Sequence, residues 1–408
     1  MLRMFNTDEA FRTLCLYNDW WTVLLSNPPA DNSETETERK CKEICYKIQN
    51  FDSLWGSPTP DCGKIFAGGL FSCLKVRGNS MFVGMLDGLI KMWRISERET
   101  WRRPVRMFEG HEESVTCLDV DSEVLVSGSL DHSVRVWSTQ TSCLLRVLRR
   151  QGSPILMVRL LSDRLLWWTR AGSLQISSWR GFRRVEPDFK FSLLEDPVFC
   201  LMDVGEHYIV TTDTQEAPGH SSRDLIVYSS RTGMRLLEKD IFSSHDISCL
   251  ALQSQLLYIG CGNTVEVWDV KMSRCLALIQ SASSHNLNIR VKNIAVSDFL
   301  VVVSLSNGNI FYLPAIKIIE QSLLNTPEPA IINWDVSATM IFNTEQTWKN
   351  IDFSGSNLVF GLEKRLGDIK IFKWNQELPE KARAPNTNIK LKYEEEPSEA
   401  FDDVIDLK

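Results

Sequence analysis

The sequence lacks the features that mark several large classes of protein. Its longest uncharged apolar runs, such as 299–305, are far too short to cross a bilayer. Residues 1–21 alternate charged and apolar positions instead of forming a signal-peptide core. We therefore expect a cytoplasmic or nuclear protein without a membrane partner.

Signatures of catalysis and of cofactor binding are also missing. The segment GSPTPDCGK at 56–64 has six residues between its glycines, where a phosphate-binding loop has four. No CxxC pair occurs, and Cys41 and Cys45 have no second pair nearby to complete a zinc site. We predict no enzyme activity, no metal and no cofactor. The balance of 45 Lys and Arg against 52 Asp and Glu, a net charge of −7, argues against nucleic acid as a partner.

Six of the eleven cysteines are better explained by an internal repeat. FSCLKV, VTCLDV, VFCLMDV and ISCLAL are versions of one segment, and ILMVRL, VKNIAV and WKNIDF are further copies. These seven copies begin at Phe71, Val115, Ile155, Val198, Ile247, Val291 and Trp348, a spacing of 40 to 57 residues. A second run closing on an aromatic residue, such as SVRVW ending at Trp137, follows about twenty to thirty residues after most copies. Short β-rich runs separated by turns at this period predict four-stranded antiparallel blades of a β-propeller.

One repeat carries a nearly complete family signature. Residues 110–137 contain Gly-His, the strand SVTCLDV, the segment VSGS, a turn aspartate and VRVW. This repeat resembles those of the WD-repeat family. The resemblance implies a hydrogen-bonded structural network of His111, Ser127, Asp131 and Trp137. We therefore expect an all-β, seven-bladed WD40 β-propeller preceded by a short α-helical N-terminal module.

Three segments follow from this interpretation. Residues 61–376 form the propeller, 1–60 a helical module and 377–408 an acidic tail that we expect to be disordered. A closed ring needs its last sheet completed, and we expect 61–66 to pair with the sheet of 348–374. The irregular stretch 315–340 is expected to supply the outer strand of the sixth blade and a surface excursion.

The N-terminal segment adds a second resemblance. NDWWTVLLSN at 18–27, a charged helix at 38–55 and WD repeats follow in the order seen in F-box/WD-repeat proteins, here with an incomplete F-box. The resemblance implies a Skp1-type cullin adaptor bound through residues 1–56. The side chains it assigns to adaptor binding are Phe11, Leu14, Trp20, Trp21 and Leu24. The alternative is a helical cap or dimerisation arm on a propeller scaffold.

Basic residues at two repeat positions suggest a ligand surface. In F-box/WD-repeat proteins that bind phosphorylated peptides, basic residues precede the Cys-like position or stand two before the closing aromatic. The matching residues here are Lys91, Arg135, Lys292, Lys349 and Lys370. Such a crescent would bind an acidic or phosphorylated protein substrate, whereas the simpler alternative is that strand ends carry charge because they face water. The resulting hypothesis is the substrate-recognition subunit of an SCF-type ubiquitin ligase; the alternative is a WD-repeat scaffold without a role in ubiquitin transfer.

Overall fold

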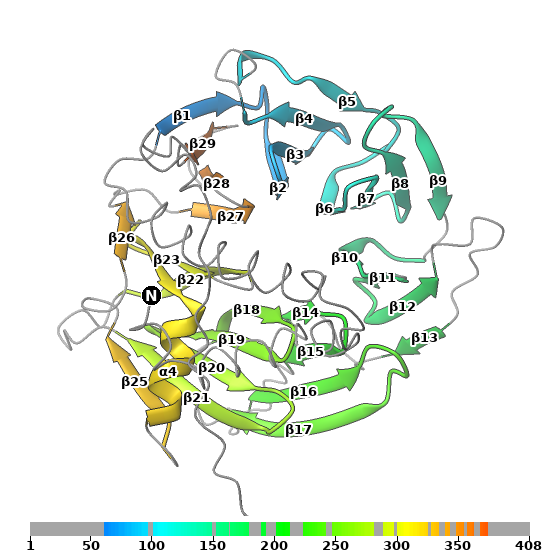
Figure 1. The fold of residues 1–408 in the computed structure, drawn as a ribbon. Helices are drawn as coiled ribbons and strands as arrows, with labels where there is room; N and C mark the ends of the chain where they lie inside the picture. Colours follow the sequence, from blue (N-terminus) through cyan, green and yellow to red (C-terminus); the bar gives the residue numbers. More distant parts are fainter. Residues whose placement is uncertain are drawn as a thin grey trace, which may run out of the picture. The chain divides into compact units, whose positions relative to one another are not determined.

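The computed structural model describes residues 61–373 apart from 97–100, 149–151, 163, 179–188, 193–200, 213–222, 242–246, 281–288, 298–299, 325–327, 334–338, 343–347, 355–356 and 363–367. Within these residues the strands β1 to β29 form seven hydrogen-bonded sheets, numbered here in chain order. Figure 1 shows the sheets arranged around a common centre. The predicted helical module and acidic tail lie outside the described residues and stay predictions.

Sheets 1 to 4 each contain four consecutive strands. Sheet 1 consists of β2 (Phe71–Arg77), β3 (Ser80–Met85), β4 (Ile90–Arg94) and β5 (Arg106–Phe108). Sheet 2 consists of β6 (Val115–Val120), β7 (Val124–Ser129), β8 (Val134–Ser138) and β9 (Leu144–Leu148). Sheet 3 consists of β10 (Ile155–Leu160), β11 (Arg164–Thr169), β12 (Ser173–Ser178) and β13 (Phe189–Ser192). Sheet 4 consists of β14 (Met202–Val204), β15 (Tyr208–Thr212), β16 (Arg223–Ser229) and β17 (Arg235–Ile241).

The remaining sheets include strands from more distant parts of the chain. Sheet 5 consists of β18 (Ile247–Gln253), β19 (Leu256–Cys261), β20 (Thr264–Asp269), β21 (Arg274–Gln280) and β25 (Ala330–Asn333). Sheet 6 consists of β22 (Val291–Val296), β23 (Leu300–Leu305), β24 (Ile310–Pro314) and β26 (Thr339–Phe342). Sheet 7 consists of β27 (Trp348–Ser354), β28 (Asn357–Leu362), β29 (Asp368–Lys373) and β1 (Asp61–Phe66).

The fold class predicted from the sequence needs correction. Seven equivalent four-stranded blades were expected, but six sheets have four strands and sheet 5 has five. Its extra strand β25 pairs with β21 in parallel, from Ala277 opposite Ala330 to Gln280 opposite Asn333. The helix found in the described residues is α4 (Ala315–Leu324), between β24 and β25 and not at the N-terminus. Its Ile318 and Ile319 are buried in the same apolar cluster as β21 and β25, so this insertion belongs to the core.

Closure of the ring agrees with the sequence-based expectation. β1 pairs antiparallel with β29, from Asp61 opposite Lys373 to Phe66 opposite Asp368. The stretch 315–340 behaves as expected only in part, because β26 completes sheet 6 whereas β25 joins sheet 5. The first described strand, β1, therefore completes the sheet formed by the last described strands and removes an open edge.

Apolar contacts between neighbouring sheets form the core. The first strands of neighbouring sheets contact one another, for example β2 with β6 and β6 with β10, and β27 with β2 where the ring closes. Phe82 and Phe108 of sheet 1 pack in one cluster with Val115 and Trp137 of sheet 2. Because neighbouring sheets cover both faces, second strands such as β7, β19 and β23 are buried along their whole length. Each fully buried aliphatic side chain contributes about 1.5–3 kcal/mol.

The repeated cysteine has a packing role at these contacts. Six first strands, β2, β6, β10, β18, β22 and β27, have a β-bulge at the position before the Cys or its equivalent. In sheet 2 the bulge residue Thr116 donates a hydrogen bond of 2.6 Å to the carbonyl of Ile155 in sheet 3. A Cβ at Gly128 would lie 2.7 Å from the Cys117 sulfur and 2.4 Å from Ile155. Cysteine and glycine at these positions therefore allow the two sheets to approach closely.

Candidate functional site

The predicted basic residues lie at one end of the sheets. In consecutive antiparallel strands, the second-to-third-strand turns and the connections between sheets share one end, which we call the linker face. Its best-described part comprises the turns at 86–89 and 130–133 and the connection 109–114. All five predicted residues stand in the first three positions of first or third strands, so they begin at this face: Lys91 in β4, Arg135 in β8, Lys292 in β22, Lys349 in β27 and Lys370 in β29. They come from four consecutive sheets, because β22 contacts β27, β27 contacts β2, and β2 contacts β6.

Two of these lysines occupy bulge positions. The pairing of β22 with β23 shifts between Val291 and Asn293, at Lys292. The pairing of β27 with β28 shifts between Trp348 and Asn350, at Lys349. A bulge directs its extra side chain away from the regular alternation. Where sheets 1, 2 and 5 have a serine or threonine that bonds across the bulge, sheets 6 and 7 have a lysine, and Lys292 is exposed.

Lys91 and Lys370 are half-buried. The Lys91 ammonium donates a hydrogen bond of 2.8 Å to the carbonyl of Ala67, which fixes its direction. Lys370 stands opposite Lys64 of β1, and Lys64 forms an ion pair of 2.6 Å with Asp368. The Lys91 side chain is therefore held in place by neighbouring main chain.

Arg135 has a different role from the one predicted. It is only 5% exposed, and its Nη2 atom lies 3.9 Å from the Asp131 carboxylate. Its Nε donates to Ser133 at 3.4 Å, and its guanidinium lies 6.0 Å from the centre of the Trp137 ring. A Cβ at Gly110 would lie 2.4 Å from Arg135 Nη1, so glycine makes room for this side chain. Arg135 is thus an internal structural residue, and the cationic surface is left with four lysines.

The four residues assigned to the structural network are joined by hydrogen bonds. Trp137 Nε1 donates to Ser127 Oγ at 2.9 Å. Ser127 Oγ lies 2.7 Å from His111 Nε2, and His111 Nδ1 lies 2.7 Å from Asp131. With His111 neutral, Ser127 donates to Nε2 and Nδ1 donates to the carboxylate, so each partner has a matching role. The chain of bonds ties the connection before β6 to β7, to the following turn and to β8.

Burial and hydrogen bonding set the charge states in this network. Burial lowers the pKa of His111 below its ordinary 6.5, against the opposing effect of Asp131. Burial alone would raise the pKa of Asp131, but hydrogen bonds from Ser133 and His111 outweigh it and lower that pKa. The network therefore contains a neutral imidazole and an ionised carboxylate at neutral pH.

A second set of polar contacts, which the sequence reasoning missed, joins the first strands of different sheets. Asp119 accepts a hydrogen bond of 2.7 Å from the main-chain nitrogen of Leu160 in the next sheet. Asp203 does the same for Leu252 at 2.7 Å. Asp352 closes the ring by accepting from Val76 at 2.6 Å. Each aspartate is the second-to-last residue of its inner segment, in LDV, MDV or IDF, and this repeated position is the sequence signal that could have identified the set.

Cations complete this inner set of charges. Arg159 Nη2 lies 2.7 Å from the Asp203 carboxylate. The negative charges of Asp203, Asp119 and Asp352 together raise the pKa of Arg159. Lys75 lies 3.8 Å from Asp352. The position that these charged residues occupy in their first strands is alanine in sheets 5 and 6, at Ala251 and Ala295. The inner contacts are therefore concentrated in the other five sheets.

The structure leaves the predicted adaptor-binding residues untested, and metal binding can be examined only among the described residues. Phe11, Leu14, Trp20, Trp21 and Leu24, assigned to adaptor binding, lie outside the described residues. Among the described residues, no group of three or more His, Cys, Asp or Glu side chains is arranged to hold a metal ion. The helix that the structure describes is also too short to span a bilayer.

The repeat and the fold agree with known proteins. The model of the family "WD domain, G-beta repeat" matches residues 102–138, which contain the whole hydrogen-bonded network. The chain is similar to a crystal structure of the WD40 repeats of RRP9, with 15% identity, a TM-score of 0.58, and coverage of 78% of this chain and 99% of that one. At this identity the similarity shows the fold.

Sequence relatives match shorter segments. Kinesin-like protein KIF21B of Mus musculus is 22% identical over 198 residues, which cover 45% of this chain and 10% of the relative. The probable E3 ubiquitin ligase complex SCF subunit scon-2 of Neurospora crassa is 36% identical over 67 residues, 14% of this chain and 10% of the relative. The chain thus spans about a tenth of the length of these relatives.

Together the sheets and the hydrogen-bonded network define a β-propeller whose residues 102–138 match the model of a WD40 repeat. The linker face with its lysines is the candidate functional surface.

Proposed function

We propose that this protein is the substrate-recognition subunit of an SCF-type ubiquitin ligase, working in the cytoplasm or nucleus, and that its linker face binds acidic or phosphorylated protein segments. The observation that carries the ligand class is the placement of Lys292 and Lys349 at bulges of neighbouring sheets, with Lys370 in the same sheet as Lys349 and Lys91 in the next sheet along the ring. Ammonium groups bond carboxylate and phosphate oxygens strongly.

The ligase role is supported by two features of the sequence. The SCF subunit scon-2 is among the relatives, and a segment resembling an incomplete F-box precedes the propeller. In this proposal, residues 1–56 bind a Skp1-type adaptor while the linker face holds the substrate. The protein then acts by proximity, because tethering raises the effective concentration of substrate near the transferase. It contributes binding and leaves the chemistry to its partners.

The ligase role is tested by affinity purification of the full chain from cells. We expect a Skp1-type adaptor and a cullin to copurify with the wild type and to be lost from a Trp20→Ala/Trp21→Ala variant. A Lys292→Glu/Lys349→Glu variant serves as the matched control, because it should keep the adaptor. Failure of the wild type to recover any adaptor would contradict the proposal.

A WD-repeat scaffold without a role in ubiquitin transfer is the second candidate. It is favoured by the match to KIF21B, which covers 45% of this chain, compared with 14% for scon-2. A scaffold predicts partners that copurify equally with the wild type and with the Trp20→Ala/Trp21→Ala variant, and no cullin among them. The same purification therefore separates the two candidates.

A further inference from the structure

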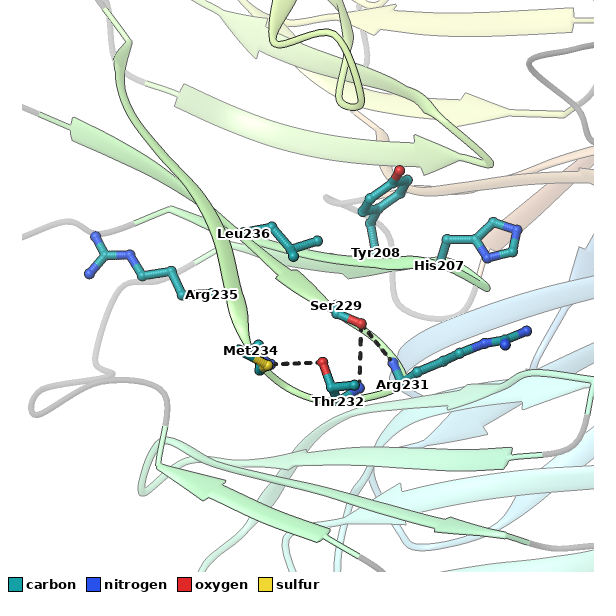
Figure 2. Close-up of a pocket in the computed structure, with 8 residues that line it drawn as sticks. All are labelled: His207, Tyr208, Ser229, Arg231, Thr232, Met234, Arg235 and Leu236. Atoms are coloured by element: carbon teal, nitrogen blue, oxygen red, sulfur yellow. Dashed lines mark hydrogen bonds between the residues drawn. The ribbon is translucent and has the colours of Figure 1, made fainter.

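A cavity lies at the end of sheet 4 that is opposite to the linker face. The first-to-second-strand turn at 205–207 and the third-to-fourth-strand turn at 230–234 meet here, and the cavity between them has a volume of about 470 Å³. This volume falls within the range of ligand-binding pockets, about 300–1,000 Å³. Its lining residues, drawn in Figure 2, are His207, Tyr208, Ser229, Arg231, Thr232, Met234, Arg235 and Leu236.

The lining combines positive charge with exposed apolar groups. It contains two arginines and a histidine but no carboxylate. Met234 is 67% exposed and Leu236 is 54% exposed, although both are large apolar side chains. Figure 2 shows Arg231 extending on the same side of the view as the His207 ring, whereas Arg235 projects to the opposite side. Within the described residues, the guanidinium of Arg231 makes no hydrogen bond or ion pair, so it is available to a ligand.

The turn that carries Arg231 and Met234 is held in place before any ligand arrives. Ser229 Oγ accepts from the main-chain nitrogens of Arg231 and Thr232, both at 3.3 Å. Gly233 adopts a φ of 66°, and its nitrogen donates to the carbonyl of Ser229 at 2.8 Å. A preorganised site loses less conformational entropy when it binds.

The neighbouring sheet reinforces this arrangement. Arg164 of β11 donates to the carbonyl of Ser230 at 2.6 Å and to that of Glu206 at 3.3 Å. Ser230 nitrogen donates to the carbonyl of His207 at 3.0 Å. One arginine from sheet 3 therefore fixes both turns that border the cavity.

The turn does not need these side chains for its own structure. Sheet 2 has the same turn, in which Ser138 Oγ accepts from Thr141 and Ser138 nitrogen donates to the carbonyl of Cys143. At the positions of Arg231 and Met234, two and five residues after the serine, that turn has Gln140 and Cys143. The cation and the exposed thioether in sheet 4 are thus additions to a turn that forms without them.

We propose that this cavity binds a short acidic peptide segment of a partner protein, one that carries a carboxylate beside a large aliphatic or aromatic side chain. The carboxylate bonds to Arg231 next to His207, and the apolar side chain covers Met234 and Leu236. Charge complementarity selects this occupant, because the Arg231 guanidinium borders the cavity and no carboxylate lines it. The site is independent of the linker face and of the ligase role.

The test begins with a random twelve-residue peptide library displayed on phage, with the full-length protein as bait at about 0.15 M salt. We expect the enriched peptides to share an Asp or Glu close to a Leu, Ile, Phe or Trp. The best peptide is then synthesised, and its dissociation constant is measured by fluorescence anisotropy. Arg231→Glu should weaken binding at least about tenfold, since a charged hydrogen bond is lost and a repulsion replaces it.

Matched controls separate this site from general charge and from the linker face. Arg77→Glu reverses an exposed arginine that ends β2 in sheet 1, at the same end of the sheets as the cavity, and should bind normally. Leu236→Ser should weaken binding, whereas Ile331→Ser, at a 66% exposed residue of β25, should not. Lys292→Glu/Lys349→Glu should also bind normally, so that failure here and failure of the proposed function are distinguishable.

Three results would overturn the proposal. The library could yield no enriched motif, its motif could lack a carboxylate, or the selected peptide could bind Arg231→Glu as tightly as the wild type. A second copy of this chain is the competing occupant. Sedimentation would reveal it as a wild-type dimer that Arg231→Glu dissociates, and that outcome also contradicts a site for a partner peptide.

Discussion

The guanidinium of Arg159 lies 2.7 Å from the carboxylate of Asp203, and this contact joins the first strands of two consecutive sheets. The other oxygen of the same carboxylate accepts from the main-chain nitrogen of Leu252 in the sheet after that. Asp203 therefore bonds to both neighbours of its own sheet. The two side chains are 28% and 11% exposed, so water screens the pair only in part.

Replacing Asp203 should destabilise the propeller. Asp203→Ala leaves Arg159 without its partner and the Leu252 nitrogen without its acceptor, which we expect to cost about 2–4 kcal/mol. The free energy of unfolding from urea titrations measures this loss. Glu123→Ala, at an exposed turn position, is the control, and equal stability of both variants would show that the inner contacts do not hold the sheets together.

Ser127 is the central member of the network in sheet 2, and it is fully buried. Ser127→Ala removes the acceptor for Trp137 Nε1 and the partner of His111 Nε2, so we expect a loss of about 2–4 kcal/mol. Trp137→Phe removes the donor and fills most of the same space. Because the two side chains share one hydrogen bond, the double variant should be less destabilised than the sum of the single ones, and strict additivity would contradict the coupling.

Stability should fall as the pH drops through about 6.5, because of His111. Its pKa is lowered in the folded state, so the unfolded chain binds a proton more readily and acid favours unfolding. His111→Gln cannot take up that proton, and its melting temperature should change less between pH 7.5 and pH 5.5 than that of the wild type. His132→Asn, at an exposed turn residue, should keep the wild-type slope. An unchanged slope in His111→Gln would show that other groups cause the effect.

The repeated cysteines should be unreactive in the folded protein. Burial raises the pKa of Cys117 and of Cys249 to about 11, so almost no thiolate forms at pH 7.5. Cys143 is exposed and serves as the internal comparison. Iodoacetamide labelling followed by mass spectrometry should modify Cys143 first, and the other two only after unfolding. Rapid labelling of Cys117 would mean that the sheets do not pack as described.

The sequence predicted those parts of the structure that repeat. The segment around each cysteine located the first strands, because four of the seven copies have the same small thiol and the others keep the apolar pattern around it. The need to complete the last sheet placed 61–66. The insertion at 315–333 was misassigned, since nothing in its pattern distinguishes a strand that completes its own sheet from one that joins the previous sheet. The five-stranded sheet and α4 therefore came from the structure alone.

The candidate site was predicted less well, for a physical reason. Strand position places Arg135 beside the four lysines, but its environment depends on Gly110 and Asp131, which come from a different connection and turn. A missing Cβ and a carboxylate 3.9 Å away turn an expected surface cation into a buried one. The inner aspartates were overlooked for the opposite reason: their segments resemble ordinary strands, and only the register of neighbouring sheets shows what they bond.

The most direct test of the central claim, that the linker face binds acidic protein partners, is a quantitative comparison of the proteins that copurify with three full-length forms. These are the wild type, Lys292→Glu/Lys349→Glu, and Lys271→Glu, which reverses an exposed lysine in the third-to-fourth-strand turn of sheet 5 at the other end. We predict that partners with acidic or phosphorylated segments fall at least about tenfold in the double variant and not in Lys271→Glu, while melting temperatures stay equal. Full retention of those partners by a folded double variant would contradict the account.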